Sequence, residues 1–345
     1  MVTYNQLVPV FVITGYLGSG KTTLINQMLR DPSLSDAAVL VNEFGAVGID
    51  HMLVQEMDEN TVLLQSGCIC CTIRSDLKDS IIDLNSRREA GLIPRYKRLI
   101  LETTGLADPS PILFTLNSDM IIKHHYRLGT VITTVDCVNG LAQLSRRSES
   151  VKQVLVADRV VLTKPDLVKQ EKINRLKSKI NKLNPTANVS ECLLGNINIK
   201  EILEADIYQK NNKGSEVRRW LEEYKSEDHH HLHNKTNISR HDKTIYSFTI
   251  KYNKPLDWTA FGIWLTMLLN HHGENILRVK GILNVKGVDA PVVINGVQHV
   301  VHPPIHLKKW PSEDRYSHLV FIVDGIDQDV IERSLGVFNG LIGQN

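Results

Sequence analysis

VPVFVITGYLGSGKTT, residues 8–23, runs from an apolar strand-like segment through a glycine-rich loop into a helix-forming segment. Residues 15–22 fit the phosphate-loop pattern G-x-x-x-x-G-K-[ST], in the strand-to-helix context that the pattern requires. Glycines there let backbone N–H groups converge on phosphate oxygens, and the helix N-terminus adds partial positive charge. We expect nucleotide contacts from Gly15, Gly18, Ser19, Gly20, Lys21, Thr22 and Thr23.

Outward from this loop, short apolar segments alternate with amphipathic helical ones through the first 200 residues. The predicted strands are residues 8–14, 39–41, 62–64, 99–102, 131–135 and 160–163, and two of the predicted helices are residues 21–30 and 76–89. Near-continuous apolar strands are typical of parallel sheets covered on both faces. This alternation predicts an α/β fold with a doubly wound, mostly parallel sheet, and the phosphate loop makes it a P-loop domain.

The sequence changes character near residue 210. Residues 209–242 are polar and charged, and they contain His229, His230, His231 and His233. Strand and helix patterns resume at residues 244–252, 258–270, 276–285, 291–301, 318–323 and 327–338. We therefore predict a P-loop domain at residues 1–208, a polar His-rich linker at 209–242 and a smaller α+β domain at 243–345. The histidines either scavenge metal or solubilise the linker.

Composition excludes some classes of function. The 345 residues include 40 Lys and Arg against 38 Asp and Glu, a net charge of +2, which makes no electrostatic case for nucleic acid or membrane partners. The sequence shows neither a signal peptide pattern nor an apolar stretch long enough to span a bilayer. We expect a cytoplasmic protein.

Two further segments complete a nucleotide site. LILETTG, residues 99–105, is an apolar strand ending in Glu102, which we expect to hold Mg²⁺ together with Thr22, while Gly105 approaches the γ-phosphate. TKPD, residues 163–166, follows a later strand. The Asp166 carboxylate can accept from both guanine donors, whereas adenine would leave it unpaired, so we expect GTP rather than ATP. Lys164 would pack its stem against the purine, and Thr163 stands where Asn is commoner.

The expected catalytic residues are Lys21, which reaches the β- and γ-phosphates, Thr22 and Glu102. Leu106 occupies the position after Gly105, where Ras-like GTPases place a water-orienting Gln. Because leucine cannot orient water, we expect GTP hydrolysis to be slow without a bound metal, a partner or a second subunit.

Three of the five cysteines lie within GCICCT at residues 67–72, namely Cys68, Cys70 and Cys71. Thiolates on one side of an extended segment suit a soft or borderline cation and leave a position open for its release. Buried structural cysteines and a redox pair are the alternatives. Glu43 is a candidate metal ligand, a Mg²⁺-side acid or a solvated loop residue. We expect Cys137 and Cys192 to be packing residues.

Together, GYLGSGKTT, VNEFGAVGID, GCICCT, ETTGLADP and TKPD, in this order, resemble the CobW-like family of metal-chaperone P-loop GTPases. LRVKGIL at residues 277–283 and GVQH at 296–299 resemble its C-terminal domain. The resemblance implies Mg²⁺·GTP binding and the handling of Zn²⁺, Co²⁺ or Fe²⁺ at Cys68, Cys70 and Cys71. It also implies client metalloproteins as partners, and a nucleotide-dependent homodimer fits the incomplete hydrolytic site.

Four functions remain open at this point. The leading one is a GTP-driven metallochaperone, with zinc as the most plausible metal. A cobalt or iron insertion factor, for cobalamin synthesis or nitrile hydratase activation, is the alternative within the family. A small-molecule kinase with an incidental metal and a passive metal store using the His-rich tract belong to other classes.

Overall fold

The computed structural model describes residues 6–41, 62–65, 73–193, 198–199, 245–311 and 313–342. The chain divides into two compact units, Met1–Lys179 with Ala187–Gln209 and Ile180–Thr186 with Lys210–Asn345. Each unit has its own sheet and is described by itself. The linker predicted at residues 209–242 lies outside the described residues, so its boundaries stay a prediction.

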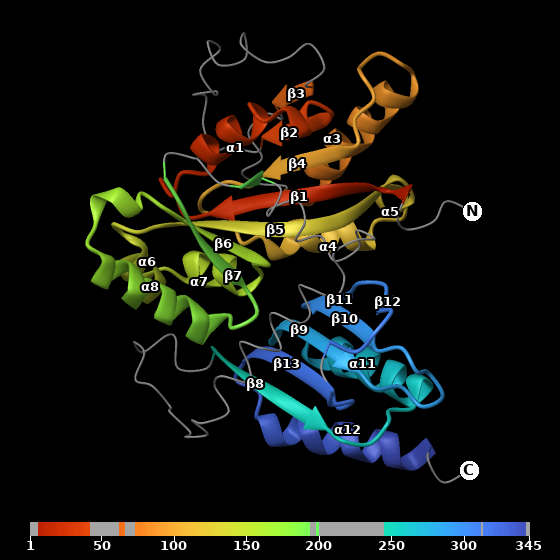
Figure 1. Ribbon diagram of the computed structural model, residues 1–345. Helices are drawn as coiled ribbons and strands as arrows, with labels where there is room; N and C mark the ends of the chain where they lie inside the picture. The colour runs from red at the N-terminus through yellow and green to blue at the C-terminus, as the bar shows by residue number, and fades with distance from the viewer. Residues whose placement is uncertain are drawn as a thin grey trace. The chain divides into compact units, whose positions relative to one another are not determined.

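A seven-stranded sheet with the order β3-β2-β4-β1-β5-β6-β7 forms the first unit (Figure 1). Its strands are β1 (Val8–Gly15), β2 (Ala37–Val41), β3 (Val62–Gln65), β4 (Arg98–Glu102), β5 (Tyr126–Asp136), β6 (Arg159–Thr163) and β7 (Asn188–Cys192). Every pairing between neighbouring strands is parallel. The chain builds the sheet outward from β1 in both directions, which confirms the predicted doubly wound α/β fold.

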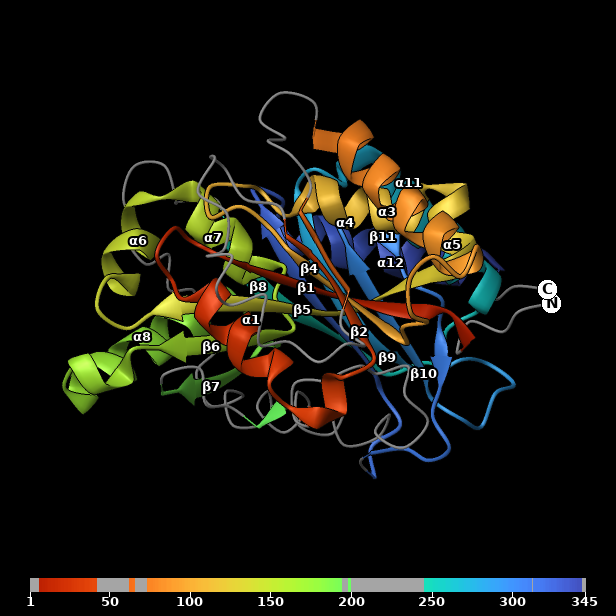
Figure 2. The same cartoon turned by 90° about the horizontal axis from the view of Figure 1, so that it is seen from above.

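Helices cover both faces of this sheet. They are α1 (Lys21–Leu29), α3 (Ile73–Glu89), α4 (Ser110–Ser118), α5 (Met120–His125), α6 (Gly140–Arg146), α7 (Ser148–Leu155) and α8 (Gln170–Leu183), with 3₁₀ turns η2 (Pro32–Leu34) and η3 (Pro165–Leu167). Figure 2 shows α1 on one side of the sheet and α3 and α4 on the other. On the α1 side, Phe11 and Ile13 share a buried cluster with Leu24, Ile25 and Met28. Burial on both faces explains why β2 is apolar throughout.

An antiparallel sheet with the order β11-β10-β9-β13-β8 forms the second unit, and β12 pairs with β10. Its elements are β8 (Ile245–Tyr252), α11 (Trp258–His272), β9 (Ile276–Leu283), β10 (Val292–Val297), β11 (Val300–Val301), β12 (Ile305–His306), β13 (Ser317–Asp324) and α12 (Gln328–Ile342). Asp257 caps α11 by accepting a hydrogen bond from the Ala260 N–H at 2.9 Å. The predicted α+β architecture is confirmed.

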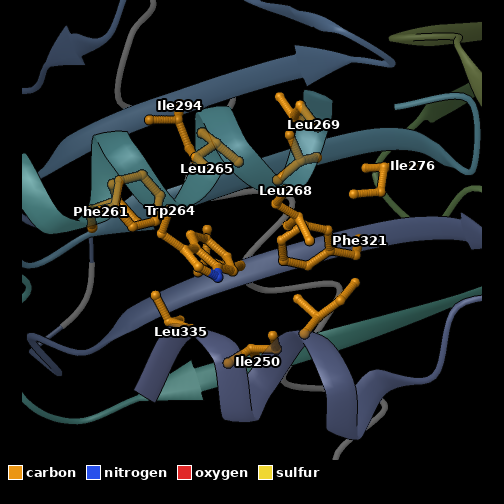
Figure 3. Packing of buried hydrophobic residues seen from close by; sticks show 14 of the residues in the cluster. Ile250, Phe261, Trp264, Leu265, Leu268, Leu269, Ile276, Ile294, Phe321 and Leu335 are labelled. Atoms are coloured by element: carbon orange, nitrogen blue, oxygen red, sulfur yellow. The ribbon is translucent and has the colours of Figure 1, made fainter. Parts of the chain in front are cut away.

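Helices α11 and α12 bury apolar residues in one cluster together with residues of the strands. Figure 3 shows Phe261 and Trp264 of α11, Phe321 of β13 and Leu335 of α12 pointing toward one another. The Trp264 indole N–H donates to Ser334 Oγ at 2.8 Å, so its polar atom is satisfied within the core.

One predicted strand of this unit is wrong. Residues 291–301 are not one strand but the hairpin of β10 and β11, in which Gly296 pairs with Val301 and Val297 with Val300. The chain reverses at Gln298, whose φ of 51° lies in the left-handed region. Among the described residues of the whole chain, no helix combines the length and apolarity needed to cross a membrane.

Candidate nucleotide site

The phosphate loop leaves the carboxyl end of β1 and enters α1. At Gly15 φ is 142°, and a Cβ there would lie 2.3 Å from Thr134 Oγ1 and 2.5 Å from the Thr134 carbonyl oxygen. A side chain is therefore excluded, and the loop lies against the end of β5. Ser19 strengthens this attachment through a 2.6 Å hydrogen bond between its Oγ and Thr134 Oγ1. The loop is thus held on a rigid strand end, where its N–H groups can converge on an anion.

The lysine of the loop folds back over it. Lys21 is 8% exposed, and its Nζ donates to the Gly15 carbonyl oxygen at 3.1 Å. An ammonium group held at the rim of the loop is available to phosphate oxygens. Thr22 is half-buried, whereas Thr23 is exposed on the surface of α1.

Thr22 and Glu102 meet at the carboxyl edge of the sheet. Glu102 ends β4 and pairs with Ile13 of β1, which places it beside the loop. It is 1% exposed, and the Thr22 hydroxyl donates to its Oε1 at 3.2 Å. A hydroxyl and a carboxylate side by side are the oxygen ligands that Mg²⁺ takes, so the residues present fit that ion.

Gly105 lies against the phosphate loop from the other side. A Cβ at Gly105 would lie 2.7 Å from both Leu17 Cα and Leu17 N, so the two backbones touch. Gln153 of α7, which is fully buried, donates from Nε2 to the carbonyl oxygens of Gly105 at 3.2 Å and Ala107 at 3.1 Å. The segment after β4 is therefore fixed between the loop and α7. Leu106, the next residue, is 54% exposed.

The TKPD segment is bonded to the phosphate loop by two side chains. Thr163 Oγ1 donates to the Ser19 carbonyl oxygen at 2.7 Å and contacts that of Val135 at 3.4 Å. Lys164 Nζ donates to the Gly18 carbonyl oxygen at 2.8 Å. The threonine thus supplies a loop contact at the position where Asn is commoner. Asp166 lies exposed in η3, two residues beyond Lys164.

Sequence reasoning missed Asp136, the last residue of β5. Its carboxylate accepts hydrogen bonds from the Val138 N–H at 2.7 Å, Asn139 Nδ2 at 3.0 Å and Lys164 Nζ at 3.0 Å. Burial by itself would raise the pKa of Asp136, but the bonds from Lys164, Val138 and Asn139 outweigh it and hold the pKa below its usual range. An acid at a strand tip, as at Glu102, was the available signal. Gln153 gave none.

The residues expected to bind the transition metal, Cys68, Cys70, Cys71 and Glu43, lie outside the described residues. Within the described part of the chain, no group of three or more His, Cys, Asp or Glu side chains is placed to hold a metal ion. Cys137 and Cys192 are buried thiols, as predicted. Burial, with the nearby Glu191 and Asp136 carboxylates, raises the pKa of Cys137 to about 11, so it stays a protonated packing residue.

Known proteins resemble this chain over nearly its whole length. It is 30% identical over 317 residues to the zinc chaperone YjiA of Escherichia coli (strain K12), which covers 91% of this chain and 93% of the relative. It is 29% identical over 325 residues to the zinc-regulated GTPase metalloprotein activator 1 of Schizosaccharomyces pombe, with 85% and 76% covered.

The crystal structure of Zn(II)-bound YjiA GTPase from E. coli shares the fold, with a TM-score of 0.70 at 24% identity over 96% of this chain and 99% of that one. Residues 9–191 match the family model of the CobW/HypB/UreG nucleotide-binding domain. Residues 245–338 match that of the cobalamin synthesis protein CobW C-terminal domain. With a phosphate loop, a buried strand-tip acid and a TKPD segment gathered at one edge of a parallel sheet, the chain belongs to the CobW family.

Proposed function

We propose that the protein is a GTP-dependent zinc chaperone. It binds GTP with Mg²⁺ at the edge of the parallel sheet and Zn²⁺, its cargo, at Cys68, Cys70 and Cys71, with Glu43 as a further ligand. Hydrolysis releases the zinc to a client metalloprotein. The zinc chaperone and zinc-regulated activator names of the relatives favour zinc over cobalt or iron.

The phosphate chemistry follows from the loop. Loop N–H groups and Lys21, whose ammonium already lies 3.1 Å from the Gly15 carbonyl oxygen, hold the β- and γ-phosphates. Thr22 and Glu102 are the residues that would hold Mg²⁺, which neutralises charge on the phosphate oxygens when bound. The Gly105 N–H faces the γ-phosphate without a side chain between them.

Guanine selection rests on the TKPD segment. The exposed Asp166 carboxylate is free to accept from the guanine N1–H and N2 amino groups, and the Lys164 stem gives the purine an apolar surface. Leu106, which cannot orient water, leaves hydrolysis slow. A second copy of the chain or a bound client completes the site, and we include a nucleotide-dependent homodimer in the proposal.

The single observation that carries the coupling of nucleotide to zinc is the strand register. Val41 of β2 pairs with Gln65 of β3 on one side and with Glu102 of β4 on the other. The segment with Glu43 continues from Val41, and the segment with the three cysteines continues from Gln65. Val41 and Gln65, the last described residues before these two segments, therefore lie within two strand spacings, about 10 Å, of the Glu102 backbone. We infer that binding of the γ-phosphate and Mg²⁺ beside Glu102 orders the two neighbouring segments and thereby assembles the zinc ligands.

Nucleotide turnover tests the enzymatic part. We expect slow release of free phosphate from GTP, little from ATP, and loss of the GTP preference in Asp166→Asn, because the amide puts a donor against the donors of guanine. The loss corresponds to roughly 1–3 kcal/mol. Asp289→Asn, at an exposed carboxylate of the second unit, is the matched control. Equal turnover of GTP and ATP by the wild type would contradict the guanine site. GDP formed without matching free phosphate when acceptors are present would favour a kinase.

A further inference from the structure

Asp136 combines burial with a complete set of partners. It is 2% exposed at the end of β5. Its Oδ1 accepts a hydrogen bond from the Val138 N–H and its Oδ2 accepts one from Asn139 Nδ2. These two bonds hold the carboxylate in place independently of Lys164. The third bond, from Lys164 Nζ at 3.0 Å, joins this fixed carboxylate to a different loop.

Lys164 joins two loops in turn. Its Nζ donates to Asp136 and also, at 2.8 Å, to the Gly18 carbonyl oxygen of the phosphate loop. Its backbone has φ 54° and ψ 41°, a left-handed conformation that non-glycine residues adopt only when surroundings enforce it. The side chain is 39% exposed, so water competes for the ammonium group, and a fixed anion is needed to keep the stem in one place.

We propose that Asp136 is the positioning residue for guanine selection, acting through Lys164 to hold the TKPD loop in register with the phosphate loop. The inference rests on the guanine site of the proposed function and extends it to a residue outside the TKPD segment. Without the carboxylate, the Lys164 ammonium group has a single remaining acceptor among its two, the Gly18 carbonyl oxygen, and water competes with that bond. The stem under the purine and Asp166, two residues further on, then lose their fixed positions.

Asp119 provides a matched control. Its carboxylate also accepts a backbone N–H two residues ahead, from Ile121 at 2.9 Å, and also pairs with a lysine, Lys78, at 2.8 Å. It lies at the start of α5, away from both nucleotide loops. Asp136→Asn and Asp119→Asn therefore remove the same kind of interaction at two places.

The test measures dissociation constants for GDP and ADP on the full chain with Mg²⁺ and without zinc. We expect Asp136→Asn to weaken GDP roughly tenfold, or about 1.4 kcal/mol, with ADP changed less than about twofold, and Asp119→Asn to change neither. A purely structural role would weaken both nucleotides alike. If thermal melting shows that Asp136→Asn is unfolded, Asp136→Ser replaces it, because the uncharged serine hydroxyl can still accept the hydrogen bond from the Val138 N–H.

A double-mutant cycle shows whether Asp136 acts through Lys164. We expect Asp136→Asn combined with Lys164→Met to bind GDP no worse than Lys164→Met alone. Additive losses, or an unchanged GDP-to-ADP ratio in Asp136→Asn, would overturn the inference while leaving the guanine site intact. A wild-type protein without GDP preference would contradict the guanine site and the inference together. Zinc delivery does not enter the readout.

Discussion

Replacing Gly105 with alanine should separate the phosphate loop from the segment after β4. The added Cβ would lie 2.7 Å from the Cα and N of Leu17, both of them backbone atoms that cannot rotate away. Ordinary contact begins at 3.4 Å, so the gap must widen by about 0.7 Å. Gly105 does not have the positive φ that strains other residues, so the contact alone sets the effect.

Neither side can yield easily. Gln153 of α7 donates hydrogen bonds to the carbonyl oxygens of Gly105 and Ala107 and so holds their segment in place. Leu17 belongs to the phosphate loop, which is fixed on β5. Overpacking of this kind costs about 1–3 kcal/mol, and each kcal/mol lowers the melting temperature of a unit this size by roughly 2–4 °C. Because the Gly105 N–H is expected to face the γ-phosphate, a GTP analogue should lose more affinity than GDP.

Thermal melting of the wild type and Gly105→Ala, each without nucleotide, with GDP and with a non-hydrolysable GTP analogue, measures both effects. Gly262→Ala in α11 is the control, since a Cβ there meets nothing within 4 Å and a helical glycine gains about 0.5–1 kcal/mol on becoming alanine. If Gly105→Ala melts like the wild type and keeps its response to the GTP analogue, the close approach of the two loops is not as described.

Lys21→Ala should lose nucleotide binding and hydrolysis while keeping its circular dichroism and melting; normal GTP turnover would remove Lys21 from the site. Thr163→Val removes the 2.7 Å hydrogen bond to the Ser19 carbonyl oxygen, and it should lower the free energy of unfolding in urea by about 1–3 kcal/mol. Thr163→Ser keeps the hydroxyl and should lower it less. Equal stability of the two variants would refute the role of the hydroxyl. Burial would raise the pKa of Asp108, but hydrogen bonds from Lys152 and Ser110 lower it below its usual value. The stabilisation by the Asp108 carboxylate is therefore present above its unfolded-state pKa of about 3.9 and is lost as pH falls through its folded-state pKa. The difference in free energy of unfolding between the wild type and Asp108→Asn should thus shrink below about pH 4. A difference that does not change with pH would contradict this.

Much of the first unit followed from the sequence because parallel strands buried on both faces appear as apolar runs. β7 did not, since Asn188–Cys192 is a polar edge strand with one fully buried residue. The start of β5 was also missed, because Arg127 and Gly129 interrupt its apolar pattern. In the second unit, the left-handed backbone of the turn falls on Gln298. Asn295 and Gly296, the residue types that usually mark such a turn, lie inside β10 instead, so the position of the turn could not be predicted from them.

The nucleotide residues were predictable as motifs, but the connections between them were not. Two of these connections join residues that lie far apart in the chain, Thr163 with Ser19 and Lys164 with Asp136. A local sequence pattern cannot predict such pairs. Asp136 did share with Glu102 the position of an acid at a strand tip. In the sequence, Gln153 is an ordinary polar residue of a helix, and only the fold brings it to the Gly105 carbonyl oxygen as a hydrogen-bond donor.

Zinc affinity measured in three nucleotide states tests the central proposal most directly. The full chain, loaded with a non-hydrolysable GTP analogue, with GDP or with nothing, competes with a chromogenic chelator for Zn²⁺, and the variant with Cys68, Cys70 and Cys71 replaced by Ser is the control. We expect the GTP and GDP states to differ by at least about tenfold, or roughly 1.4 kcal/mol, with GTP affinity raised by the same factor when zinc is bound. The variant should lose the tight site in every state. Equal zinc affinity in all three states would contradict nucleotide-driven delivery.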